Sequence, residues 1–420
     1  MSRLIKSLMY SASEMPFFSA SRCADSLSHF GSTISYLIWF AIIVRLIYVK
    51  YYVILAPMST VVKTLKVRVK DNKANALNRM AFEVNQVWNN ANEITAEYSS
   101  VPMPGFGYLR SNFSAYDLHP FQKRYRKERG LNITAQTVQE VTEAHAKARR
   151  QFKKDKLRWR VSGGPRRSLG WVPFKKGAAK WKNGCLYFAG HYFKVWDSYG
   201  LSKYEFRSGS FSQDARGRWY FNIAVSVPVE KTTATKAVGM DLGLKDTATC
   251  SNGFKLEAHR FYRNGEAQLG KAQRANKKKR VKAIHAKIKN RRLDSIHKFT
   301  TQVVRENAFI VVGNLSSSGL AKTKMAKSVL DAGWFMLKTM IEYKSKRTQS
   351  EFIEVNEAYT TQACSCCGCI SGSSPRGRAG LGIREWSCSE CGAHHDRDVN
   401  AAMNILAAGH RRLAGGIPVL

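Results

Sequence analysis

The chain has 420 residues, enough for two or three domains, and 44% of them are hydrophobic. It can therefore build packed cores, and the composition excludes a disordered polycation. The 68 Lys and Arg residues outnumber the 30 Asp and Glu residues, which gives a net charge of +38. A compact protein with this imbalance repels itself unless a polyanion neutralises it, so we expect a nucleic acid partner. A solvated basic surface, or a ribosomal type of protein, is the alternative explanation of the charge.

The N-terminal residues 1–57 differ in composition from the rest. Their apolar stretch, residues 34–57, is interrupted by Arg45 and Lys50, and its longest uncharged run is shorter than the ~18 residues that a membrane-spanning helix needs. We see no signal-peptide pattern of an early apolar core and a small-residue cleavage site. At Met58 the sequence changes to the alternating pattern of a strand. We interpret residues 1–57 as an upstream extension and expect no membrane association, with a membrane anchor as the alternative.

The next part of the chain combines strands with a small helical region. Residues 61–69 alternate apolar and basic side chains, as a half-buried strand does. Apolar residues recur at helical spacing over 77–91 and 138–152, and a loop marked by Pro and Gly lies between them. Short strands separated by Gly, Asn and Ser return over 160–229 and predict a small barrel or twisted sheet.

Aromatic residues are interleaved with Lys and Arg in these later strands. This arrangement suits the stacking of bases and the binding of phosphates, and plain sheet core is the equal alternative for each residue. The aromatic residues are Trp171, Phe174, Trp181, Tyr187, Phe188, Trp219 and Tyr220.

From Lys236 onward, strands alternate with helices, which indicates an α/β domain. The stretch from Lys271 to Arg292 contains no acidic residue, and its apolar residues have helical spacing. We therefore predict a helix pair with a cationic face that forms a groove for a polyanion. A strand over 308–315, a helix over 332–344, a strand over 352–357 and a last helix over 399–408 follow.

Six of the nine cysteines lie between residues 364 and 391. Cys364 and Cys367 form one Cys-x2-Cys-Gly knuckle, and Cys388 and Cys391 form a second about twenty residues later. Two such knuckles complete the four-thiolate shell of a structural zinc ion in a reducing compartment. Cys366 and Cys369 are surplus, and pairings that include Cys369 stay open.

Three of the few acidic residues stand at positions that suit catalysis. Asp241 follows a strand at a turn, and Asp396 and Asp398 begin the last helix. Carboxylates at a strand end and a helix start can converge on divalent metal ions, which clamp the oxygens of a phosphodiester. The alternatives are a turn residue for Asp241 and a helix N-cap for Asp396 or Asp398.

The motifs of the second half, taken in order, resemble those of the TnpB family, the transposon-encoded relatives of type V CRISPR effectors. The resemblance is clear over residues 235–410, weaker over 58–235, and absent over 1–57. Its motifs are GMDLGLKD, KNRRLDSIHKF, VVGNLSSS, DAGWFMLKTMIEYKSKR, EAYTTQACSCCG and REWSCSECGAHHDRDVNAAMNIL.

The resemblance implies an RNA-guided DNA endonuclease that uses two-metal catalysis. It implies an α/β, RNase H-like (RuvC) nuclease domain at 236–362 and 393–420, with a zinc ribbon inserted at 363–392. An oligonucleotide-binding β-barrel, the wedge domain, is expected at 58–75 and 160–235, with a helical recognition lobe inserted at 76–159. The implied cofactors are Mg²⁺ or Mn²⁺ in the nuclease site and Zn²⁺ in the ribbon.

The implied partners are a guide RNA from the transposon end and double-stranded target DNA with a short adjacent motif, which places the protein in the cytoplasm with the nucleoid. We expect the acid-free helix pair to bind nucleic acid through Lys277, Lys278, Lys279, Arg280, Lys282, Lys287, Lys289, Arg291 and Arg292. A strand-transfer transposase is a weaker hypothesis, because no isolated tyrosine nucleophile stands out.

The family pattern makes Asp241 the first catalytic acid and Asp398 the last, but it places a Glu where this chain has Gly313. We predict that Glu357 replaces it, because Glu357 shares a strand face with Ile353 and Val355 and would emerge beside the ribbon. Glu354 points to the opposite face and is the second choice. The alternative is a catalytically inactive RNA-guided DNA-binding protein.

Overall fold

The structure is a computed structural model that describes residues 59–99, 102–103, 107–108, 113–154, 156–377 and 379–415. These residues fall within one compact unit, Ser59–Leu420. The predicted upstream extension, residues 1–57, lies outside the described residues. Within the described ranges no helix has both the length and the apolar character needed to cross a membrane.

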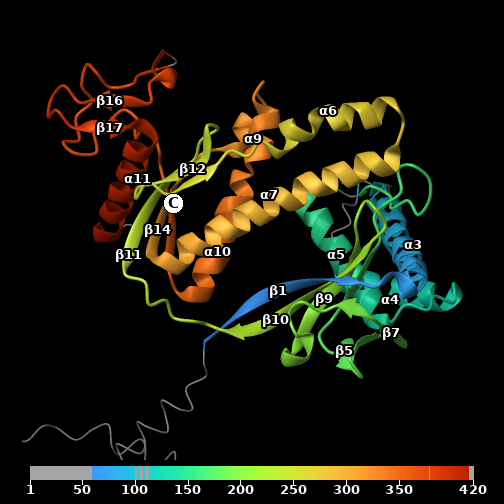
Figure 1. Cartoon of the computed structure of the whole chain (residues 1–420). Helices are drawn as coiled ribbons and strands as arrows, with labels where there is room; N and C mark the ends of the chain where they lie inside the picture. Colours follow the sequence, from blue (N-terminus) through green and yellow to red (C-terminus); the bar gives the residue numbers. More distant parts are fainter. Residues whose placement is uncertain are drawn as a thin grey trace, which may run out of the picture. The chain divides into compact units, whose positions relative to one another are not determined.

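The first half of this unit is built on an antiparallel sheet (Figure 1). Its strand order is β4-β9-β10-β1-β8, and β1 pairs with β10 along nearly its whole length. The strands are β1 (Thr60–Val69), β4 (Trp171–Phe174), β8 (Val195–Trp196), β9 (Phe206–Gln213) and β10 (Trp219–Pro228). A separate three-stranded sheet consists of β5 (Ala179–Lys182), β6 (Cys185–Phe188) and β7 (His191–Phe193).

The expected barrel is not a closed ring in the described residues, because β4 and β8 are the edges of the five-stranded sheet. The two sheets instead share one apolar core. Three of the interleaved aromatic residues, Phe174, Phe188 and Trp219, are fully buried in that core, so for them the core interpretation is correct.

Three helices form the predicted helical region: α3 (Ala74–Ser99), α4 (Ala115–Glu128) and α5 (Ala135–Phe152). The first and last match the predicted apolar periodicity, and the buried residues Leu77, Val84 and Val141 lie on their inner faces. Helix α4 lies outside the predicted periodic stretches, and it carries Pro120 in its interior. A short hairpin, β2 (Pro102–Met103) and β3 (Gly107–Tyr108), lies between α3 and α4.

The second half contains a five-stranded mixed sheet of order β13-β12-β11-β14-β15, in which β11, β14 and β15 are parallel. The strands are β11 (Lys236–Asp241), β12 (Asp246–Cys250), β13 (Lys255–Glu257), β14 (Asn307–Gly313) and β15 (Glu351–Val355). Its helices are α6 (Phe261–Arg274), α7 (Lys278–Glu306), α8 (Ser317–Leu320), α9 (Ala326–Ala332), α10 (Trp334–Thr348) and α11 (Arg397–Ala414).

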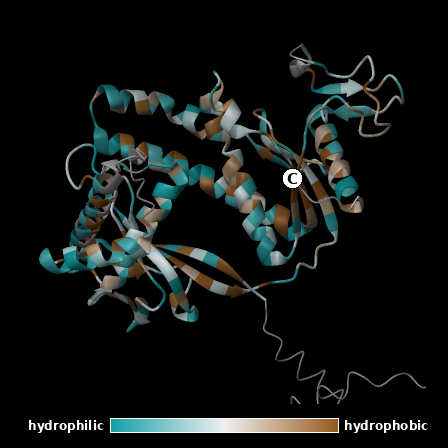
Figure 2. Cartoon of the chain, turned by 180° about the vertical axis from the view of Figure 1, so that it is seen from behind, coloured by the Kyte–Doolittle hydropathy of each residue, from teal (hydrophilic) through white to brown (hydrophobic). Residues whose placement is uncertain are grey.

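Helices cover both faces of this sheet, so the α/β prediction is confirmed (Figures 1 and 2). The apolar residues of α7 and α10 pack on Val238, Ile310 and Val312, and α11 packs on the opposite face through Ile405 and its neighbours. The turn between α6 and α7, residues 275–277, lies inside the acid-free stretch. Helix α7 therefore carries most of the basic residues and also the apolar residues that follow them in sequence. A two-stranded hairpin, β16 (Glu385–Ser387) and β17 (His394–Asp396), precedes α11.

Candidate active site and metal cluster

Three carboxylates meet at one edge of the mixed sheet. Asp241 is the last residue of β11, Glu357 lies two residues beyond β15, and Asp398 is in the first turn of α11. Because β11 and β15 run parallel on either side of β14, their carboxyl ends lie at the same edge. The structure thus brings together the three residues that the sequence proposed as a set.

Glu357 occupies the space above Gly313, the last residue of β14. A Cβ atom at position 313 would overlap Oε2 of Glu357 and lie 3.2 Å from its Cβ. The carboxylate of Glu357 therefore stands where a side chain from the end of β14 would stand. The absence of a side chain at Gly313 makes room for it.

The two acids at and after β15 lie on opposite faces of the sheet, as the alternation predicted. Val355 and Ile353 pack against α11, on the face that also carries Glu357. Glu354 instead pairs with Lys338 of α10 at 2.7 Å. Glu354 is therefore held away from the carboxylate group, and Glu357 is the acid that this strand supplies.

Burial raises the affinity of Asp241 and Glu357 for protons. For Asp241, burial comes first, followed by the charges of Asp398 and Glu357; together they raise its pKa to about 7, against the weaker opposing effects of Arg397 and the Leu242 amide. Burial also raises the pKa of Glu357. Within the described residues, Oε2 of Glu357 is buried and has no hydrogen-bond partner.

This donor set fits divalent cations. Hard ions such as Mg²⁺ and Mn²⁺ prefer carboxylate oxygens, and a cation would compensate the crowded negative charge that burial leaves unbalanced. A buried carboxylate oxygen without a partner is the kind of group that a bound ion satisfies.

The start of α11 separates the roles of its two acids. Asp396 is the N-cap, and its carboxylate accepts hydrogen bonds from the amides of Asp398 (2.9 Å) and Val399 (3.0 Å). The N-cap alternative is therefore correct for Asp396. The carboxylate of Asp398 does not cap the helix and lies near Asp241, and Arg384 contacts both of its oxygens at 3.3 Å.

Several cations at this site were missed by sequence reasoning, among them Arg384 and Lys255. Arg384 reaches Asp398 from the strand hairpin, and Lys255 of β13 contacts Asp396 at 3.2 Å. Lys255 is 141 residues distant from Asp396 in sequence, and nothing in its local sequence distinguishes it from the chain's many other basic residues.

Close packing of α11 on the sheet sets the position of Asp398. A Cβ atom at Gly239 of β11 would overlap the carbonyl of Ala402, so the helix crosses directly over this glycine. Ala401 and Ala402 are fully buried, and their small side chains permit this close approach.

The four cysteines of the two knuckles form a compact cluster. The sulfur atoms of Cys364, Cys367, Cys388 and Cys391 all lie within 4.8 Å of one another. Cys366 and Cys369 are exposed and stand outside the cluster, so the pairing by two-residue spacing is the one that the structure supports. Four thiolates at this separation suit a structural zinc ion.

Two further residues support this cluster. The ring of His395 lies 3.0 Å from the sulfur of Cys364, through Nε2. The side chain of Asn400 on α11 accepts from the Ser365 amide at 2.8 Å and donates to the carbonyl of Ala363 at 2.8 Å. Because Asn400 lies two residues after Asp398, the start of α11 anchors both the cysteine cluster and the carboxylate site.

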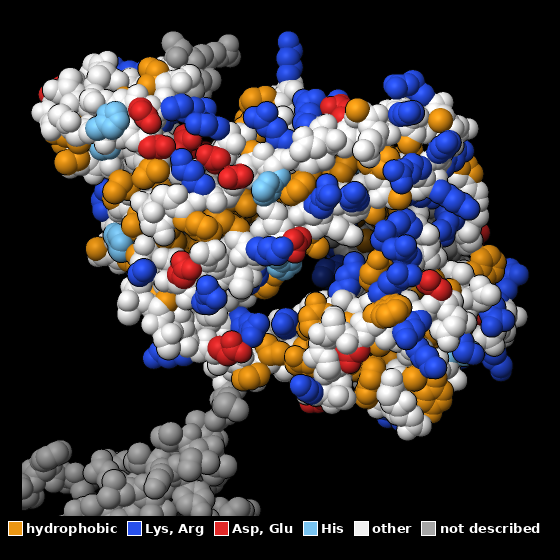
Figure 3. Space-filling view, viewed as in Figure 1, with side chains coloured by type: hydrophobic (Ala, Val, Ile, Leu, Met, Phe, Trp, Pro, Cys, Tyr) orange, Lys and Arg blue, Asp and Glu red, His pale blue; other side chains and the backbone are white. Residues whose placement is uncertain are grey.

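The predicted cationic face lies on α7 and the turn before it. Eight of the nine predicted residues are exposed: Lys277, Lys278, Lys279, Arg280, Lys282, Lys287, Lys289 and Arg291. Figure 3 shows Lys and Arg side chains gathered over the region of α6 and α7. Arg292 does not belong to this face, because it is mostly buried and pairs with Asp331 of α9. Helical geometry turns Arg292 inward, which the charge pattern alone did not show.

Half-buried aromatic residues of the first half lie close to cations. Lys66 lies over the ring of Tyr220 at 4.6 Å, and Arg160 over the ring of Trp171 at 5.6 Å. Such pairs keep a flat apolar surface and a positive charge side by side, as binding of single-stranded nucleic acid requires.

Comparison with known proteins locates the chain among relatives of two kinds. The family described as "Probable transposase" (OrfB_IS605) matches residues 220–324, and the family "Cas12f1-like, TNB domain" matches residues 334–405. The resemblance to TnpB is therefore confirmed for this part of the chain.

Curated relatives carry related names. The chain is 39% identical over 213 residues to a Streptomyces pristinaespiralis protein named "Putative RNA-guided DNA endonuclease", covering 47% of this chain and 52% of that protein. It is 30% identical over 232 residues to "Putative RNA-guided DNA endonuclease InsQ" of Escherichia coli (strain K12), covering 48% and 56%. The chain thus spans about half the length of these relatives.

A solved structure shares the fold. The Cas12f1 chain in a cryo-EM structure of a Cas12f1–sgRNA–target DNA complex matches 82% of this chain and 98% of its own length, with a TM-score of 0.52 and 12% identity.

Proposed function

We propose that this protein is an RNA-guided DNA endonuclease, associated with a transposable element, that hydrolyses phosphodiester bonds in an RNase H-like (RuvC) site. The observation that carries the proposal is the position of Glu357 above Gly313, beside Asp241 and Asp398. A third carboxylate is present despite the glycine at the end of β14. The relatives named as RNA-guided DNA endonucleases support the same activity.

In this proposal Asp241, Glu357 and Asp398 hold two divalent cations, Mg²⁺ or Mn²⁺. Bound there, the two ions would activate a water molecule and stabilise the attacking and leaving oxygens. The protein's own part is to keep three carboxylates at one sheet edge. Arg384 holds Asp398 in place, and α11 is fixed by its close contact with β11.

The remaining regions would position RNA and DNA. The five- and three-stranded sheets (58–75 and 160–235) and the helical lobe (76–159) would bind a guide RNA derived from the transposon end, together with the cationic face of α7. The nuclease domain comprises 236–362 and 393–420, and the zinc ribbon 363–392. The target is double-stranded DNA that carries a short adjacent motif, in the cytoplasm with the nucleoid.

The test is cleavage by the protein purified with its co-expressed RNA. The RNA is sequenced, and duplex DNA matching its variable end is incubated with Mg²⁺, with Mn²⁺ or with EDTA. We expect cutting that requires both a matching guide and a metal ion, and we expect Asp241→Ala to abolish it. Guide-dependent DNA binding without cutting under any metal would support the inactive DNA-binding protein instead.

RNA binding is tested separately, because it depends on charge and not on the carboxylates. Replacing Lys282, Lys287 and Lys289 by Gln should weaken RNA binding. It should also reduce the slope of the salt dependence by roughly 0.7–0.9 for each RNA phosphate that is no longer neutralised. RNA affinity that is unchanged at all salt concentrations would remove α7 from the RNA-binding surface.

A further inference from the structure

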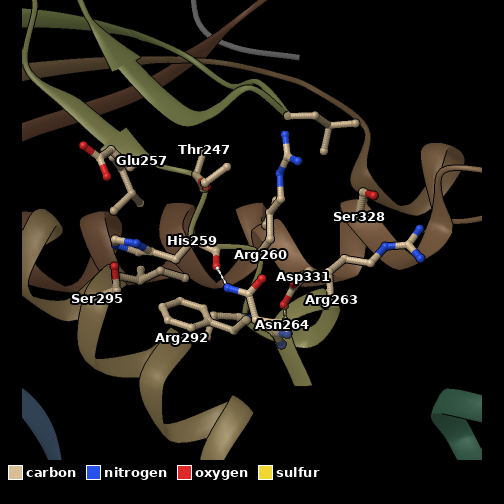
Figure 4. A pocket seen from close by; sticks show the side chains of 16 residues that line it. Thr247, Glu257, His259, Arg260, Arg263, Asn264, Arg292, Ser295, Ser328 and Asp331 are labelled. Atoms are coloured by element: carbon tan, nitrogen blue, oxygen red, sulfur yellow. Dashed lines mark hydrogen bonds and ion pairs between the residues drawn. The ribbon is translucent and has the colours of Figure 1, made fainter. Parts of the chain in front are cut away.

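A pocket separate from the carboxylate site lies at the same end of the mixed sheet. It has a volume of about 570 Å³ and is enclosed by the end of β13, the start of α6, and parts of α7 and α9 (Figure 4). In the sheet, Asp246 at the start of β12 lies opposite Glu257 at the end of β13. Glu257 lines the pocket. The carboxylate site does not include any of the residues that line it.

The walls of the pocket differ in chemistry from side to side. Arg260 and Arg263 supply positive charge on one side, and Glu257 and His259 lie on the other (Figure 4). The rings of His259 and Phe261 form an aromatic pair, 5.1 Å between centroids. A cation beside a flat apolar wall matches the phosphate and the base of a nucleotide.

Arg260 is held in a conformation that L-residues seldom adopt. Its φ is +46°, and it precedes the first residue of α6. Neighbouring hydrogen bonds secure this geometry: Asn264 donates to the carbonyls of both His259 and Arg260, each at 2.9 Å. Strain of this kind persists where the surrounding structure imposes it and often marks a functional position.

In the described part of the chain, the Arg260 guanidinium forms no ion pair or hydrogen bond. Arg260 is exposed, and the other arginines that line the pocket are already paired: Arg263 pairs with Glu266 at 3.0 Å. Asp331 accepts from the Tyr262 amide at 2.8 Å and pairs with Arg292. Arg260 is therefore the cation that the pocket has available for a ligand.

We propose that this pocket binds one nucleotide of the DNA strand that enters the carboxylate site, with its phosphate on Arg260 and its base against His259 and Phe261. This inference rests on the proposed function. DNA is favoured over RNA because β13 joins the two sites: Lys255 contacts Asp396 beside Asp398, and His259 lies only four residues farther along. Four residues span at most about 14 Å, a distance that a few nucleotides bridge.

The experiment measures base unstacking without hydrolysis. The RNA-loaded full-length protein is mixed, in EDTA, with target duplexes that carry a single 2-aminopurine at successive positions of one strand. Fluorescence of this base rises when it leaves its stack. We expect the rise at one or two neighbouring positions, and we expect Arg260→Gly and Phe261→Ala to remove it there.

Arg260→Gly also separates a ligand role from a structural one. Glycine adopts positive φ without strain, so this variant should unfold at a higher temperature while its affinity for the DNA falls about tenfold. Gln349→Gly is the matched control, because Gln349 also has positive φ (55°) but is the C-cap of α10 and does not line the pocket. It should gain stability in the same way and leave the position-specific signal intact.

The proposal is overturned if Arg260→Gly keeps the wild-type signal, or if the signal disappears equally at every position. A signal that appears only when 2-aminopurine is placed in the guide RNA overturns the assignment to DNA. Because the measurement needs no cleavage, an inactive wild-type protein that still shows the position-specific rise would refute the nuclease proposal and leave the pocket standing.

Discussion

The carboxylate of Glu357 fills the space that a side chain on Gly313 would take, although the two residues come from neighbouring strands. A site that needs three carboxylates can thus obtain its third from β15 and not from β14. A divalent metal ion requires a carboxylate at a particular position. Any strand that ends close enough to that position can supply it.

This relationship predicts that the third carboxylate can be moved from position 357 to position 313. Glu357→Gln should lower cleavage about a hundredfold or more while RNA and DNA binding persist. The double variant Gly313→Glu, Glu357→Ala should recover at least about tenfold of that loss, because the new side chain enters the vacated space. Cleavage rates of the RNA-loaded variants in Mg²⁺ measure both effects.

Glu354→Gln is the matched control for this series. It alters an acid of the same strand that pairs with Lys338 on the other face of the sheet, and it should cut like the wild type. Wild-type cutting by Glu357→Gln would remove Glu357 from the site.

Cys388→Ala should lose zinc and lower the unfolding temperature of the protein. Three thiolates with an open position bind zinc less tightly, and structural zinc contributes folding free energy of about 10 kcal/mol or more in small zinc domains. Cys369→Ala, an exposed cysteine outside the cluster, should keep full zinc content. Metal analysis of the two purified variants decides the assignment, and equal zinc in both would contradict it.

His145 should make stability depend on pH. It is fully buried on α5 against the edge of Trp88, and burial, with the nearby charge of Arg149, lowers its pKa to about 4. The unfolded chain binds this proton near pH 6.5, whereas the folded protein resists it down to about pH 4. Above pH 6.5 this group therefore does not lower the free energy of unfolding. As the pH falls to 4, it lowers the free energy of unfolding by about 3 kcal/mol.

The measurement is urea unfolding of the wild type and of His145→Phe at intervals between pH 4 and 7. The difference in unfolding free energy between them isolates this residue from other titrating groups. A difference that stays constant over this range would show that His145 does not carry the effect.

Removal of residues 1–57 should leave the zinc content, RNA affinity and cleavage of the protein unchanged. The change in composition at Met58 motivates this expectation, and the compact unit that begins at Ser59 contains every residue of the proposed sites. Loss of activity on truncation, or recovery of the full chain with membranes, would show that the segment has a role.

Much of the candidate site could be predicted from local sequence, since each of its signals spans only a few residues. Two Cys-x2-Cys knuckles specify a tetrathiolate cluster because each pair shares one turn. The alternation along β15 separated Glu357 from Glu354, because successive side chains of a strand point to opposite faces. The acid-free stretch predicted a basic helix, because its apolar residues recur at helical spacing.

Only the tertiary structure decided which distant residues meet. The contact of Lys255 with Asp396 joins positions 141 residues apart, and Arg384, directly before β16, contacts Asp398 of α11. The inward turn of Arg292 depends on the neighbouring position of Asp331 on α9. The sequence specifies which residue types are available and which face of a helix or strand they occupy. Their convergence depends on how helices and strands pack, and packing is settled by the whole set of long-range contacts at once.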